Sequence, residues 1–164
     1  MARRVYFAFH YQPDISRVNV VRNSWLTQPD RDAAGFYDAS LWEESKKKGD
    51  EAIKRMINDG LKGTTVTAFL LGAKTAHRPW VKYELEKSWD RKNGLLAVYI
   101  HQIKDLDQNT TVAGDNILDL YTVNRNGQRV NLSSIYKTYE WKANYGYANF
   151  GDWVEATAKI AGSL

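Results

Sequence analysis

The sequence predicts an α/β domain in which a central parallel sheet is covered by helices on both faces. Three short apolar runs lack the alternation of half-exposed strands and so indicate strands buried on both sides: Val5 to Phe9, Thr65 to Gly72 and Leu95 to His101. A weaker strand is expected at Gly35 to Ala39. Segments with helical periodicity separate the strands, and this alternation is typical of a parallel sheet.

Each intervening helix has its own boundary signals. Asp14 can cap the first helix and Asp50 the second. Pro79 suits the first turn of the third, where its missing N–H costs no hydrogen bond, and Gly94 ends that helix. The expected buried stripes of the first two helices are Ile15, Val18, Val21 and Trp25, and then Ile53, Met56, Ile57 and Leu61.

The pattern loosens after the third buried strand. Residues 102–127 are polar and contain the turn signals DLDQNT and NRNG. A last strand is expected within SSIYKTYEW, residues 133–141, and a closing helix within residues 149–164. No repeat, low-complexity tract or linker interrupts the chain, so residues 1–164 are predicted to form a single domain.

Composition narrows the class of protein. The net charge of +4 is a weak pointer to nucleic acid, which we therefore consider an unlikely partner. No apolar run approaches the roughly 20 residues of a membrane span. The absence of cysteine excludes thiolate catalysis and favours a cytoplasmic protein. His77 and His101 lack partners at ligand spacing, so no metal site is expected. Six Trp and ten Tyr are compatible with a site that stacks flat rings.

Candidate site residues follow from the topology. Ligands of open parallel sheets bind outside the carboxyl ends of the strands, near helix N-termini. The side chains expected there that we consider for binding or catalysis are His10, Tyr11, Asp38, Trp42, Trp80 and Glu84. His10 could equally be a structural histidine, and Asp38 could cap the segment that follows it.

Trp80 and Glu84 form the most informative pair. Residues four apart share one face of a helix, and this pair is expected at the border of the buried face, close to the helix N-terminus. The helix dipole should keep the Glu84 carboxylate ionised near neutral pH. An anion beside an aromatic wall suits cleavage of an N-glycosidic bond, because it stabilises an oxocarbenium-like transition state. The spacing alone leaves open a core tryptophan and a solvated charge.

Longer motifs resemble a known family. The opening RRVYFAFHY is similar to the first strand and loop of Toll/interleukin-1-receptor (TIR) domains, and PWVKYE matches their W-x-x-x-E helix. The segments RVNVVRNSW, AAGFYDASLWEE, RPWVKYELEKS and SSIYKTYEWKANYGYANFGDWV resemble, in that order, the bacterial TIR-like proteins of the Thoeris antiphage system. The resemblance spans most of the chain, apart from residues 104–128. Animal TIR domains differ from it at HY and ASLWEE, so their docking surfaces do not transfer.

The resemblance implies a flavodoxin-like TIR fold and an enzyme that consumes NAD as a substrate rather than as a cofactor. It implies release of nicotinamide, formation of a cyclic ADP-ribose isomer and activation of a separate effector protein. Glu84 falls on the family's catalytic glutamate and Trp80 on its motif tryptophan, while the residues that fall on the pocket-lining loops are Phe9, His10, Tyr11, Asp38 and Trp42. The absence of G-x-G-x-x-G and of a P-loop fits a consumed dinucleotide.

A second function stays open. A TIR-like fold could serve as a non-catalytic signalling or nucleotide-binding module that acts through protein assembly, since fold alone does not imply activity. A homo-oligomer is also considered, because the loop after the second strand looks too short to close a pocket by itself.

Overall fold

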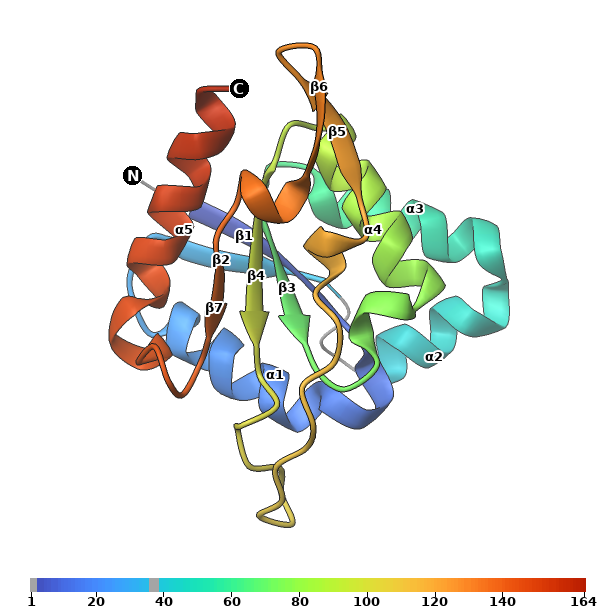
Figure 1. Ribbon diagram of the computed structural model, residues 1–164. Helices are drawn as coiled ribbons and strands as arrows, with labels where there is room; N and C mark the ends of the chain where they lie inside the picture. Colours follow the sequence, from blue (N-terminus) through green and yellow to red (C-terminus); the bar gives the residue numbers. More distant parts are fainter. Residues whose placement is uncertain (1–2, 36–38) are drawn as a thin grey trace.

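The fold is a five-stranded parallel sheet flanked by helices (Figure 1). The computed structural model describes residues 3–35 and 39–164, with the side chains of residues 39–42 left out. In spatial order the strands are β2 (Arg31–Ala34), β1 (Arg3–Phe9), β3 (Val66–Leu71), β4 (Gly94–Tyr99) and β7 (Thr138–Glu140). This order is that of the flavodoxin-like doubly wound sheet. The predicted fold class is therefore confirmed.

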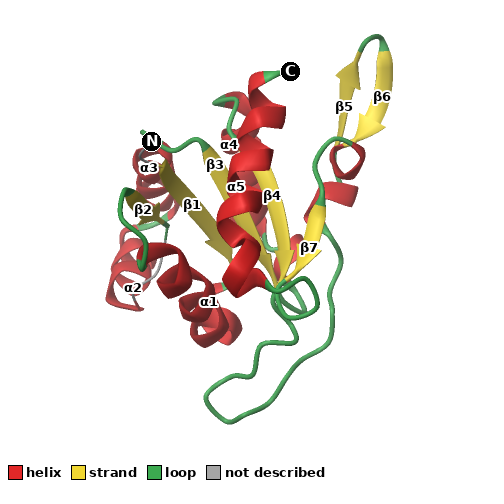
Figure 2. Cartoon of the chain, turned by 90° about the vertical axis from the view of Figure 1, so that its left-hand side faces the viewer, coloured by secondary structure: helices red, strands yellow, loops and turns green. Residues whose placement is uncertain are grey.

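Helices cover both faces of the sheet (Figure 2). They are α1 (Tyr11–Leu26), α2 (Ala39–Lys48), α3 (Asp50–Leu61), α4 (Pro79–Asp90) and α5 (Gly146–Gly162). On one face Phe7 of β1 stacks on Phe150 of α5, with ring centroids 6.1 Å apart. On the other face the ring of Tyr6 packs against Gly60 of α3. Neighbouring residues of β1 thus serve opposite layers, as the alternation of side chains along a strand requires.

The central strands have no exposed side. Every residue of β3 is buried, and β4 is buried up to Tyr99 at its carboxyl end. Burying a Val or Leu side chain contributes roughly 1.5–3 kcal/mol. These two strands, together with β1, are the ones that the uninterrupted apolar runs predicted.

The second strand was predicted at the wrong place. The structure forms β2 at Arg31–Ala34, whereas Gly35 to Ala39 was expected, and residues 36–38 of that range lie outside the described part of the chain. Gly35 has φ +121°, and a Cβ there would lie 2.4 Å from the carbonyl oxygen of Phe7. Gly35 therefore ends the strand at a close approach of two backbones. The strand itself is a polar edge strand without an apolar run.

Asp14 does not cap α1 as predicted. The N-cap residue is His10, and Asp14 lies within the first turn, 2% exposed. Its carboxylate contacts the end of β3, where a Cβ on Gly72 would lie 2.2 Å from Oδ2. It accepts a hydrogen bond from Thr75 and pairs with Arg17, both at 3.4 Å, while burial raises its pKa. Acidic capping residues and buried acidic residues look the same in a sequence.

Arg17 anchors the long loop that follows β4. Its guanidinium donates hydrogen bonds to the backbone carbonyls of Ile103, at 2.8 Å, and Asn109, at 3.0 Å. It also lies 3.6 Å from the Asp105 carboxylate. The buried Arg17 guanidinium thus holds an exposed loop, mainly through hydrogen bonds to the main chain of that loop.

The polar middle of the chain contains a hairpin that was not predicted. Strands β5 (Thr122–Arg125) and β6 (Gln128–Asn131) pair antiparallel, beyond the end of the main sheet (Figure 1). Asn126 and Gly127 between them have φ 54° and 81°, as a type I′ turn requires. The NRNG turn signal was correct, but the flanking strands are exposed and carry no apolar pattern.

The chain ends as predicted, in strand β7 followed by helix α5, which begins at Gly146 rather than at residue 149. A Cβ on Gly146 would lie 2.1 Å from the Trp141 ring, so the helix starts where the backbone passes over an indole. Among the described helices, none has the length and apolar character needed to cross a membrane.

Candidate functional site

A cleft opens at the carboxyl end of β1. It has a volume of about 280 Å³ and is lined by the β1–α1 junction, the α2–α3 region and the first turn of α4. Four of the predicted binding residues meet there: Phe9, His10, Tyr11 and Trp80. Small-molecule sites typically measure roughly 300–1,000 Å³, so the described residues enclose only part of a dinucleotide.

Two of the predicted binding residues cannot be placed against this cleft. Asp38 lies outside the described residues, and Trp42 belongs to α2 but its side chain is outside the described part. Their roles stay predictions.

The cleft is basic. Lys46 and Arg78 contribute to its lining, and Arg78 is also the N-cap residue of α4. The pKa of His10 is lowered by burial and by the nearby charges of Arg78 and Lys74, so its imidazole is neutral near pH 7. Cations and the positive end of a helix favour an anionic ligand such as a phosphate.

Arg78 and Lys46 were not predicted as site residues. Arg78 precedes Pro79 at a helix start, which is a usable signal for an anion-binding cation. In the sequence we interpret the run Lys46-Lys47-Lys48 as a solvated approach to a helix, with phosphate contact as the lesser alternative. Whether such a lysine faces solvent or a cleft depends on how the helix packs.

His10 and Trp80 present different chemistry to the cleft. Within the described part of the chain, the buried Nδ1 of His10 has no hydrogen-bond partner. That nitrogen is itself enclosed by protein atoms in the free protein. The half-buried indole of Trp80 packs edge-on against Tyr83, with ring centroids 5.7 Å apart and planes at 82°. Tyr83 in turn accepts a hydrogen bond from Asn58 at 3.1 Å, which fixes the aromatic wall to α3.

Glu84 is not among the described residues that line the cleft. It follows Trp80 by four residues of α4, or about 6 Å along the helix axis. It is 4% exposed, and its Oε2 accepts a hydrogen bond from the hydroxyl of Tyr6 in β1. Burial raises the pKa of Glu84 to about 8, and the hydrogen bond from Tyr6 lowers it. The expectation of an ionised carboxylate near neutral pH is therefore wrong for the free protein, because burial has a larger effect than the helix dipole.

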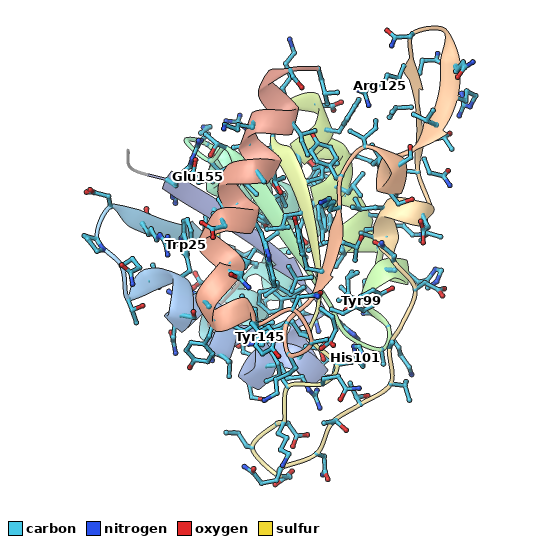
Figure 3. The ribbon with its side chains drawn as sticks, turned by 60° about the vertical axis from the view of Figure 1, so that its left-hand side comes forward. Trp25, Tyr99, His101, Arg125, Tyr145 and Glu155 are labelled. Atoms are coloured by element: carbon cyan, nitrogen blue, oxygen red, sulfur yellow. The ribbon has the colours of Figure 1, made fainter. Side chains whose placement is uncertain are left out.

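The other histidines lie elsewhere. Figure 3 shows Tyr99 and His101 at the carboxyl end of β4, where their rings meet edge-on with centroids 5.6 Å apart. His77 Nε2 lies 2.6 Å from Asp115 Oδ2 on the surface. Across residues 3–35 and 39–164, no three His, Asp or Glu side chains are grouped as a metal site requires.

Comparison with known proteins gives two concordant matches. The family model for the Thoeris protein ThsB, TIR-like domain, matches residues 6–105. A protein of Bacillus cereus (strain MSX-D12) named "Putative cyclic ADP-D-ribose synthase ThsB1" is 39% identical over 191 aligned residues, which cover 94% of this chain and all of the relative. The family-model match includes residues 6–9 of the first strand, the residues that line the cleft and the Trp80–Glu84 helix.

Proposed function

The chain belongs to the TIR-like family of the Thoeris protein ThsB, and from this premise we propose that it cleaves the nicotinamide–ribose bond of NAD to make a cyclic ADP-ribose isomer in antiphage defence. The observation that supports this most directly is the buried Glu84 carboxyl on α4, the helix whose first turn lines a net basic cleft with aromatic walls. The name of the Bacillus cereus relative supports the same reaction.

Glu84 is proposed as the catalytic residue. The nicotinamide ring of NAD carries a positive charge, and a cation next to a carboxyl favours its ionised form. Substrate binding would therefore expel the proton that Glu84 holds in the free protein. The resulting carboxylate would stabilise the oxocarbenium-like ribose as the bond from C1′ to the nicotinamide nitrogen breaks. The electron pair of that bond leaves with nicotinamide, which becomes neutral.

Ring closure completes the reaction. A hydroxyl of the adenosine half attacks C1′, a C–O bond forms, and the hydroxyl proton passes to solvent. Water competes for the same carbon and would give linear ADP-ribose. A cleft that holds the adenosine half close and excludes water favours the cyclic product.

The basic cleft is proposed to hold the diphosphate. Arg78 and Lys46 would pair with its negative charges, and the Trp80 indole would contact the nicotinamide ring or the sugar. Because the described cleft is small for a dinucleotide, we propose that a second copy of the chain completes it. The product would signal to a separate effector protein in the cytoplasm.

The test is direct. Purified protein is incubated with NAD, nicotinamide is quantified by chromatography, and the nucleotide product is identified by mass spectrometry. Glu84→Gln should abolish release, while Glu86→Gln, a matched change at an exposed position of the same helix, should leave it unchanged. Equal turnover by wild type and Glu84→Gln would contradict the catalytic role. Absence of any cleavage by the wild type would favour the non-catalytic signalling module.

A further inference from the structure

Tyr6 is the side chain in contact with the Glu84 carboxyl. It lies in the middle of β1 and is 1% exposed, and its hydroxyl donates a hydrogen bond to the Glu84 carboxyl on α4. Its ring is confined by α3, since even a Cβ on Gly60 would lie only 3.0 Å from it. The hydroxyl therefore has little freedom to point elsewhere.

The backbone of Glu84 is held separately. Ser88 Oγ donates a hydrogen bond to the Glu84 carbonyl at 2.6 Å and also contacts Thr67 Oγ of β3 at 2.7 Å. This contact attaches the middle of α4 to the sheet. Helix α4 thus fixes the position of the Glu84 backbone, and Tyr6 fixes the position of the Glu84 carboxyl group.

The two groups influence each other's ionisation. Burial and the neighbouring Glu84 raise the pKa of Tyr6 well above its ordinary value, so its hydroxyl stays protonated and can donate throughout the neutral range. The same hydrogen bond opposes the effect of burial on Glu84. A donor to a carboxylate stabilises the ionised form.

We propose that Tyr6 is a positioning residue for the NAD cleavage put forward above: its hydroxyl holds the Glu84 carboxyl in one orientation and stabilises the carboxylate when it forms. The inference rests on the proposed function. It adds a buried residue of the first strand to the catalytic apparatus. Tyr6 acts through Glu84 and does not itself contact the substrate.

The experiment measures NAD cleavage against pH for wild type and Tyr6→Phe, which keeps the buried ring and removes the hydroxyl. Since the ionised Glu84 carboxylate is the active form, kcat/KM for NAD should rise with pH. In Tyr6→Phe the midpoint of that rise should move to higher pH by on the order of one unit. At pH 7 the variant should lose about tenfold in kcat/KM, the parameter that reports the ionisation of the free enzyme.

Tyr136→Phe is the matched control. Tyr136 is equally buried but lines a different cavity, with Trp89 and Leu164. Its variant should keep the wild-type pH profile. If Tyr6→Phe fails to fold, replacing Tyr6 by 3-fluorotyrosine decides the question, because the more acidic hydroxyl is a stronger donor and should move the midpoint to lower pH.

The outcomes separate the two proposals. Wild-type protein without NAD cleavage would overturn the proposed function. Active wild-type protein whose pH midpoint is the same with phenylalanine, or with 3-fluorotyrosine, at position 6 would overturn only the role of Tyr6.

Discussion

Replacing Glu84 by glutamine should stabilise the protein, and the gain should grow with pH. The folded protein raises the pKa of Glu84 to about 8 from an ordinary value of 4.5. Between these two pH values the folded chain keeps a proton that the unfolded chain releases. Stability is therefore lost as pH rises through this interval, and the full cost is present above pH 8. Glutamine is neutral at every pH and its carbonyl can still accept the hydrogen bond from Tyr6.

The magnitude follows from the interval. From 4.5 to about 8, at about 1.4 kcal/mol per pH unit, the cost of Glu84 reaches about 5 kcal/mol. At pH 7 it is about 3 kcal/mol, and at pH 5 about 1 kcal/mol. For a chain of this size, 3 kcal/mol corresponds to a rise in Tm of roughly 6–12 °C.

Thermal unfolding at pH 5, 6, 7 and 8 measures this directly. The difference in Tm between Glu84→Gln and wild type should be small at pH 5 and widen steadily to pH 8. Glu86→Gln, at an exposed position, should show no such trend. A difference that does not vary with pH, or a glutamine variant that is less stable at pH 8, would refute the reasoning. A widening difference would show that the folded protein keeps Glu84 protonated near neutral pH.

Three further substitutions test other parts of the structure. Arg78→Gln should raise KM for NAD about tenfold with little change in kcat, because it removes binding that is common to the ground and transition states. Arg91→Gln, at the far end of α4, should leave KM unchanged. An unchanged KM for Arg78→Gln would exclude Arg78 from the diphosphate site. Gly35→Ala should cost about 1–3 kcal/mol in urea unfolding, since it combines φ +121° with a clash against Phe7, while Gly162→Ala meets open space and should be neutral. Arg17→Met should lower the free energy of unfolding by about 3–5 kcal/mol, because it leaves Asp14 buried without its cation. It should also speed hydrogen exchange in the loop after β4, because that loop loses its hydrogen bonds to Arg17. Unchanged exchange would show that the loop is held by other contacts.

The parts of the fold that sequence reasoning placed correctly are those where burial leaves a mark along the chain. β3 is buried on both sides and is an unbroken apolar run, so its position was evident. β2 is an edge strand that begins with Arg31 and Asp32, and its end is set by contact between Gly35 and Phe7. That contact joins residues far apart in the sequence. No local pattern reports it.

The candidate site, like the fold, was predicted in part from the sequence. The spacing of Trp80 and Glu84 placed both residues on one side of α4, and the strand-end rule brought His10 and Tyr11 to the cleft that Trp80 lines. The protonation of Glu84 could not be predicted, because it depends on how deeply Tyr6 and α3 enclose the carboxyl. Substrate roles for these residues remain predictions that the activity assays test.

The attachment of the loop after β4 has an evolutionary consequence. Two of the groups that Arg17 binds there, on Ile103 and Asn109, are carbonyl oxygens, which every amino acid supplies. Many exposed side chains of the loop can therefore be substituted while Arg17 keeps its hydrogen bonds to the loop's main chain. The sequence of this exposed segment can thus change at little risk to the sheet that it follows.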